Sequence, residues 1–151
     1  MTTRRFILAS AAALPFAAAF TGTARAGQEP VFARDGIAIN GYDPIAYFTE
    51  GKPIQGDAAF AVDWNGAQWR FASAANKAAF EATPEAYAPQ YGGYCAYAVA
   101  KGSTAKTEPD AWTVYEGKLY LNFNTAVRDI WKQDIPGNIQ RADANWPGVL
   151  G

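Results

Sequence analysis

The chain has 151 residues and a nearly balanced charge, with 13 basic and 14 acidic side chains and a formal net charge of −1. It contains no histidine, which excludes Ser-His-Asp and Cys-His nucleophilic catalysis and removes the commonest metal ligand. Because no other catalytic constellation stands out in the sequence, we expect a protein that is not an enzyme.

Residues 1–26 have the pattern of a cleavable export signal. The pair Arg4-Arg5 precedes an apolar run over 6–20, and Ala24-Arg25-Ala26 provides a small-residue cleavage site. The paired arginines also resemble the twin-arginine export motif, and the alternative, general secretion, leads to the same compartment. We therefore expect a periplasmic or otherwise exported protein with no stable membrane anchor after cleavage.

Cleavage after Ala26 leaves residues 27–151, which suits a single domain with a hydrophobic core. The loss of three arginines leaves 10 basic against 14 acidic residues, a net charge of −4. Since nucleic-acid binding needs a basic patch, we expect no nucleic-acid partner. The one cysteine, Cys95, cannot form an internal disulfide, so packing must stabilise the fold.

The first predicted elements of this domain are short. A polar lead-in is followed by an extended piece over 36–40. Asp43 is a good N-cap and Pro44 suits the first helical position, which predicts a helix over 44–49. Residues 53–57 are expected to form a loop.

Two stretches each predict a hairpin followed by a helix. In the first, Asn65-Gly66 separates two strand-like runs, and Ser73 then caps a helix. In the second, Glu116-Gly117 separates the runs, and Asn124 caps the helix. A shift of 51 positions brings the turns and the caps of the two stretches into register. The repetition has two explanations, an old duplication or the general recurrence of hairpins that support a helix.

A break at Pro136-Gly137 and a third helix over 139–145 complete the predicted elements. Neither hairpin-then-helix unit can bury its apolar face alone. We therefore expect an α+β fold in which both hairpins form one small antiparallel sheet with the helices packed on one face. Five tryptophans are expected to supply much of the core: Trp64, Trp69, Trp112, Trp131 and Trp146.

The stretch between the two units, YGGYCAYAVAKG, contains Cys95 just after a predicted sharp turn at Gly92-Gly93. Three interpretations of this cysteine stay open. It is a buried small hydrophobe, a redox or nucleophilic thiol, or a ligand of copper or another soft metal ion. One thiolate is too few for a closed metal site, so the third interpretation requires a second chain or an external ligand. Tyr91, Tyr94 and Tyr97 line a ligand pocket or belong to the core.

Three segments, DPIAYF, FASAANKAAFEATPEAYAPQYGGYCAYAVAKG and AWTVYEGKLYLNFN, resemble the YHS domain family in its exported, uncharacterised bacterial branch. The resemblance spans residues 40–147 and implies a small α+β domain. Some relatives are linked to metal binding, with cysteines as the presumed ligands. This chain lacks both the Tyr-His-Ser signature and the cysteines near the hairpin, so that role cannot be transferred residue by residue.

The sequence therefore predicts a non-enzymatic module that binds a small ligand or a soft metal between the two units. The expected ligand-binding residues are Tyr91, Gly92, Gly93, Tyr94, Cys95 and Tyr97, with Cys95 as the metal ligand. Two alternatives are a thiol-dependent redox protein acting through Cys95 and a purely structural or partner-binding domain.

Overall fold

The computed structural model describes residues 27–151, and the predicted export signal lies outside this range. Its strands form two sheets: β1 (Ala33–Arg34), β2 (Ile37–Ala38), β4 (Ala67–Phe71) and β3 (Asp57–Trp64) in that spatial order, and β5 (Trp112–Tyr115) with β6 (Lys118–Leu121). The helices are α1 (Pro44–Thr49), α2 (Ala74–Ala82), α3 (Pro84–Tyr87), α4 (Ala96–Ala100), α5 (Thr125–Lys132) and α6 (Ile135–Asn145). Three 3-10 turns are η1 (Ile39–Gly41), η2 (Gln90–Gly93) and η3 (Gly148–Leu150).

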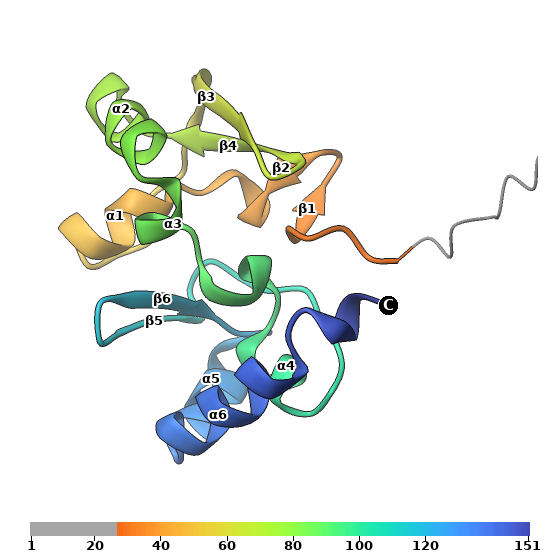
Figure 1. Cartoon of the computed structure of the whole chain (residues 1–151). Coiled ribbons are helices and arrows are strands. Elements are labelled where there is room, and N and C mark those ends of the chain that lie inside the picture. Colours follow the sequence, from red (N-terminus) through yellow and green to blue (C-terminus); the bar gives the residue numbers. More distant parts are fainter. Residues whose placement is uncertain (1–26) are drawn as a thin grey trace, which may run out of the picture.

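The α+β class is confirmed, but the prediction of one antiparallel sheet is wrong. The β3–β4 and β5–β6 hairpins lie in separate sheets, and Figure 1 shows one above the other. Strand β2 pairs in parallel with β4, with Ile37 opposite Gln68, and thereby occupies the edge of β4 that β3 leaves free. The second hairpin consequently has no place beside β4.

Local signals placed the predicted caps and turns correctly. The side chains of Asp43, Ser73 and Asn124 accept hydrogen bonds from the backbone at the starts of α1, α2 and α5. Both central residues of each hairpin turn have positive φ, 51° and 83° in the first turn and 49° and 76° in the second. Positive φ at both positions is the conformation that a type I′ turn requires.

Two predictions in the C-terminal part need correction. The pair Pro136-Gly137 does not break the chain, because α6 begins at Ile135 and includes it. Proline is tolerated in a first helical turn, and the Asp134 carboxylate accepts a hydrogen bond from the Gly137 amide at 3.1 Å. Helix α4 was not predicted, and its N-cap, Cys95, offers no side-chain cap of its own.

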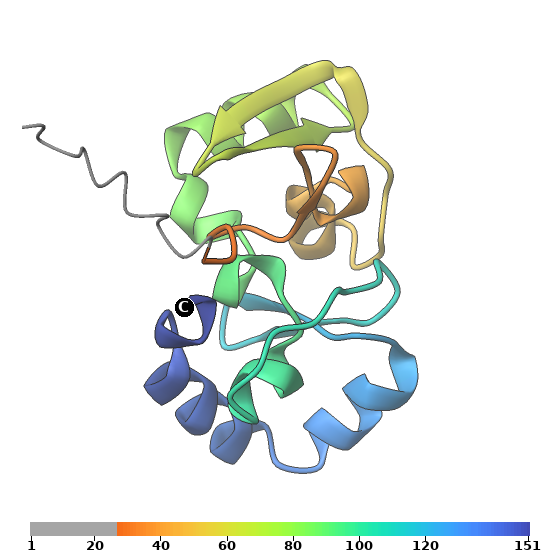
Figure 2. The same ribbon diagram turned by 90° about the vertical axis from the view of Figure 1, so that its right-hand side faces the viewer.

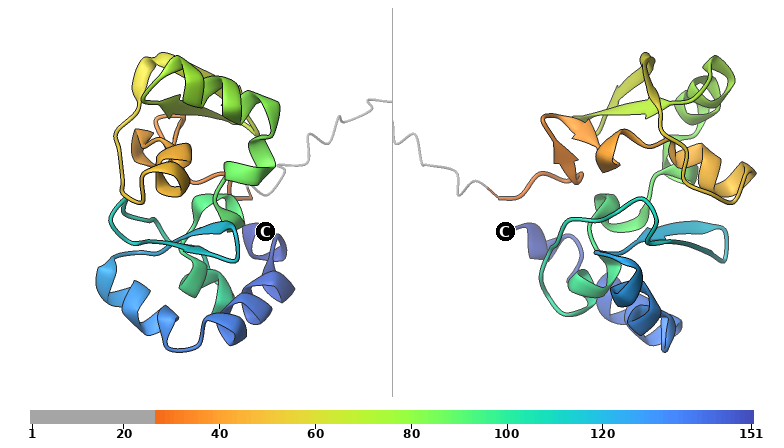
Figure 3. Two further views of the ribbon diagram at one scale, coloured as in Figure 1. Left: turned by 90° about the vertical axis from the view of Figure 1, so that its left-hand side faces the viewer. Right: turned by 180° about the vertical axis from the view of Figure 1, so that it is seen from behind.

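Strand β6 separates two hydrophobic cores. Leu119 and Leu121 belong to the core that contains Trp69, whereas Tyr120 belongs to the core that contains Trp131. Successive strand residues point to opposite faces, so one short strand contributes to both cores. Figure 3 shows the β5–β6 hairpin between the elements of the N-terminal half (residues 33–88) and the helices of the C-terminal half (residues 94–145), to which the hairpin also belongs. Of the five tryptophans, only Trp69 and Trp131 are fully buried, and the other three are partly exposed.

Residues 28–32, which we call the strap, lie along the junction of the two halves (Figure 2). Val31 packs into the first core and Phe32 into the second. The Gln28 amide donates to the Leu150 carbonyl at 2.8 Å and thereby joins the strap to the C-terminal turn. The predicted polar lead-in is therefore an integral part of the fold.

Turn η2 holds the strap against the rest of the molecule. Tyr91, Gly92 and Gly93 all have positive φ, at 58°, 63° and 85°. The Phe32 amide donates to the Gly92 carbonyl at 2.9 Å, and a Cβ on Gly92 would overlap the carbonyl oxygen of Pro30. Glycine is required at position 92 both by the backbone conformation and by this close approach.

A buried carboxylate joins three elements of the N-terminal half. Asp43 is completely buried, and its Oδ1 accepts from the Ile45 amide at 2.8 Å. Its Oδ2 accepts from the Ala72 amide at 2.9 Å and from Asn76 Nδ2 at 2.7 Å. Asp43 thus caps α1 and also fixes the passage from β4 into α2.

None of the helices within residues 27–151 is long and apolar enough to cross a membrane.

We expect Gly92→Ala to lower the free energy of unfolding by about 3 kcal/mol or more, because the Pro30 carbonyl must move to admit the new methyl group. Gly102 is the matched control, since it also has positive φ (84°) but has open space around it. Gly102→Ala should cost only about 1 kcal/mol, the price of the left-handed conformation. Equal losses for the two variants in urea unfolding would contradict the role assigned to the strap contact.

We expect Asp43→Ala to cost about 3 kcal/mol, because three donors lose their acceptor in one substitution. Ser73→Ala removes a single capping bond and should cost about 1 kcal/mol. Urea unfolding followed by circular dichroism measures both losses. A cost for Asp43→Ala no greater than that for Ser73→Ala would show that the bonds to Ala72 and Asn76 contribute little.

Candidate functional site

The six predicted ligand-binding residues lie on η2 and at the start of α4, and most of them are buried. Tyr91, Tyr94 and Cys95 are 5 %, 9 % and 1 % exposed, respectively, and Gly93 is also buried. Gly92 and Tyr97 are partly exposed. The backbone of this segment is fixed by the strap and by the pairing of the Cys95 amide with the Ala105 carbonyl at 3.0 Å.

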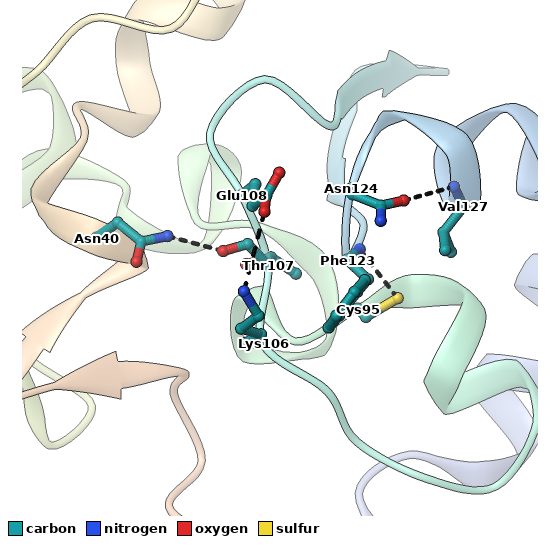
Figure 4. Close-up of polar contacts among 8 residues, drawn as sticks. All are labelled: Asn40, Cys95, Lys106, Thr107, Glu108, Phe123, Asn124 and Val127. Atoms are coloured by element: carbon teal, nitrogen blue, oxygen red, sulfur yellow. Dashed lines mark hydrogen bonds and ion pairs between the residues drawn. The ribbon is translucent and has the colours of Figure 1, made fainter.

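The Cys95 thiol lies between α4 and the end of β6 (Figure 4). Its Sγ accepts from the Phe123 amide at 3.3 Å and donates to Asn122 Oδ1 at 3.5 Å. The same Asn122 oxygen accepts from the Tyr97 amide at 3.1 Å and so caps α4 from outside the helix. Burial raises the pKa of the Cys95 thiol, and the opposing effect of nearby backbone amides is smaller. This environment favours the first interpretation of the cysteine, a small core residue.

The residues around Cys95 do not fit a metal centre. Its sulfur is enclosed, and its partners are an amide oxygen and a backbone amide. In the part of the chain that the structure describes, no three His, Cys, Asp or Glu side chains come together in a group that could hold an ion. A metal at Cys95 would therefore need both an opening of the fold and ligands from elsewhere.

The three tyrosines point to different partners. Tyr91 donates its hydroxyl to Asp143 Oδ1 at 2.9 Å, and burial, together with this bond, raises the Tyr91 pKa. Tyr94 donates to the backbone carbonyl of Glu29 in the strap at 2.7 Å. Tyr97 has the ammonium of Lys101 over its ring, 5.2 Å from the centroid. The three hydroxyls therefore do not converge on one ligand.

A groove of about 300 Å³ lies at the junction of the two halves. It includes two of the predicted residues, Tyr91 and Gly92. The sequence analysis did not assign its other lining residues to a site: Pro30, Val31, Trp64, Asn65, Trp69, Glu85, Ala88, Pro89, Gln90, Trp146, Pro147 and Leu150. They come from the strap, the β3–β4 hairpin, α3, η2 and the C-terminal turn. A groove assembled from stretches this far apart in the sequence exists only in the folded chain.

Two aromatic pairs line this groove, one on the β3–β4 hairpin and one formed by η2 and the residue that follows α6. Trp64 and Trp69 have ring centroids 5.8 Å apart at the β3–β4 hairpin. Tyr91 and Trp146 have centroids 6.0 Å apart on the opposite side of the junction. Among residues 27–151, Glu85 on α3 is the one formally charged side chain in the lining. These residues give the groove aromatic side chains and one carboxylate, and none of them is a lysine or an arginine.

We expect the Cys95 thiol to be unreactive while the protein is folded. Iodoacetamide at pH 7.5 should label it at least about 100-fold more slowly than in urea, because the sulfur becomes accessible only through opening of the fold. Mass spectrometry of quenched time points measures the rate. Rapid labelling without urea would instead support the redox or metal interpretation.

Among known proteins and families, one family model matches part of the chain. Residues 45–91 match the family model of the YHS domain, a shorter span than the 40–147 expected from the sequence. No curated protein and no solved structure matches the chain. The matched segment runs from α1 to η2 and contains Trp64, Trp69, Glu85 and Tyr91 of the groove. The chain thus contains a segment, residues 45–91, that matches the YHS domain.

Proposed function

We propose that this protein is a non-enzymatic, exported module that binds a small organic molecule in the groove at the junction of its two halves. The observation that carries the proposal is the aromatic lining supplied by Trp64, Trp69, Tyr91 and Trp146. Small-molecule sites are typically concave and mostly apolar, with a few polar groups that set orientation, and they have volumes of about 300–1,000 Å³. This groove, at about 300 Å³, is at the small end of that range.

The groove is held open by the fold itself. On one side, the Trp69 indole nitrogen donates to the Trp64 carbonyl at 3.0 Å, which fixes the ring within the hairpin. On the other side, Tyr91 is fixed by its bond to Asp143. A site whose walls are already ordered loses little side-chain entropy when a ligand binds.

The proposal of a binding role rather than catalysis follows from the chemistry of the lining. General acid–base catalysis requires a proton donor and acceptor positioned on the same substrate. Within the described residues, the groove has one carboxylate, Glu85, and a tyrosine whose hydroxyl already donates to Asp143. These groups suit recognition better than proton transfer.

Export to the periplasm is part of the proposal and is supported by the pattern of residues 1–26. Cleavage after Ala26 would retain the whole strap, beginning with the bond from Gln28 to Leu150. The two alternatives that use the thiol, redox chemistry and soft-metal binding, would require Cys95 to leave its buried position. The groove needs no such rearrangement.

The neutral fluorescent probe N-phenyl-1-naphthylamine tests the groove. We expect its emission to rise on titration with the protein. Trp64→Ala and Trp146→Ala should each weaken binding about tenfold, because each removes one aromatic wall. Trp112→Ala is the matched control, since Trp112 is also partly exposed but lies outside the groove. Circular dichroism verifies that the variants fold, and equal binding by all of them would contradict the proposed site.

A further inference from the structure

We propose that the ligand class of this groove is a compact organic cation, such as a quaternary or protonated amine. This inference rests on the proposed function and adds the charge of the ligand to it.

The first argument is the aromatic lining. The face of an aromatic ring carries partial negative charge and attracts a cation within about 6 Å of its centroid, with tryptophan the most effective. Trp64 and Trp146, which are partly exposed, line the groove together with the buried rings of Trp69 and Tyr91. The rings available to an ammonium group in the groove are therefore those of Trp64 and Trp146.

The second argument is the charge. Glu85 is the one formally charged residue of the groove lining, and neither lysine nor arginine is among the described residues that form it. An adjacent hollow beside the β3–β4 turn shares Trp64 and Asn65 with the groove, and its one charged lining residue is Asp63. An anionic ligand would lose its hydration here without gaining a partner of opposite charge. A cation gains both the ring faces and a carboxylate.

The third argument is a contrast within the same molecule. A hollow near η1 is lined by Arg34, Asp35 and Arg70, so its charges are mixed. It contains none of the aromatic residues. Aromatic surface and negative charge therefore occur together at the junction, and the junction is also where the two halves leave space.

The position of Glu85 predicts how much it contributes. Its side chain is solvent-exposed on α3, at the margin of the groove. Water and salt weaken exposed charge pairs, so the carboxylate should contribute a few-fold in affinity, whereas the rings should provide most of the preference for a cation.

The experiment compares choline with 3,3-dimethylbutan-1-ol, which has the same shape but no charge. Isothermal titration calorimetry at low ionic strength should show choline binding about tenfold more tightly than this neutral isostere. The anion 3,3-dimethylbutyrate should not bind detectably. Tighter or equal binding of the neutral isostere or the anion would overturn the inference.

Glu85→Gln removes the carboxylate and should weaken choline binding about threefold while leaving the affinity for the neutral naphthylamine probe unchanged. Glu81→Gln is the matched control, because Glu81 is also exposed but lies on α2 and is absent from the groove lining. It should leave both affinities unchanged. If Glu85→Gln has no effect on choline binding, the inference as stated is wrong.

The two proposals fail in different ways. If the naphthylamine probe binds and loses affinity in Trp146→Ala, but choline shows no advantage over its isostere, the groove is a binding site for a neutral ligand. If the probe does not bind either, the proposed function fails together with the inference.

Discussion

The close contact between η2 and the strap is the constraint on which the rest of the structure depends. Three successive residues, Tyr91, Gly92 and Gly93, adopt positive φ so that the backbone can turn beneath residues 28–32. That turn joins the N-terminal half to the C-terminal half and allows Val31 and Phe32 to enter opposite cores. The two glycines, predicted to form a sharp turn at a ligand site, therefore have a steric role.

Strand β6 and Asn122, the residue that follows it, also connect the two halves. Leu119 and Leu121 pack on one side and Tyr120 on the other, so neither half is complete without this strand. Asn122 then caps α4 through its Oδ1 and accepts the thiol hydrogen of Cys95. A thiol fixed in this way helps to position a helix, and burial keeps its pKa raised.

The parts of the fold that sequence analysis predicted are those that depend on neighbouring residues. The cap at Asp43, the turn at Asn65-Gly66 and the helix after Asn124 each follow from a few adjacent side chains. The parallel pairing of β2 with β4 depends on residues about 30 positions apart, and no local pattern encodes it. Helix α4 was missed because its Tyr97 amide is capped by Asn122, 25 positions away in the sequence.

The site was only partly predictable, for a related reason. Residue type alone predicts a core position for every tryptophan. It does not distinguish an enclosed ring, such as that of Trp131, from rings at the margin of a groove, such as those of Trp64 and Trp146. The difference arises where the two halves meet. Trp131 lies inside the second core, whereas Trp64 and Trp146 lie at the junction and stay partly exposed. The packing of the two halves thus leaves aromatic rings partly exposed at the junction, and the proposed ligand site depends on them.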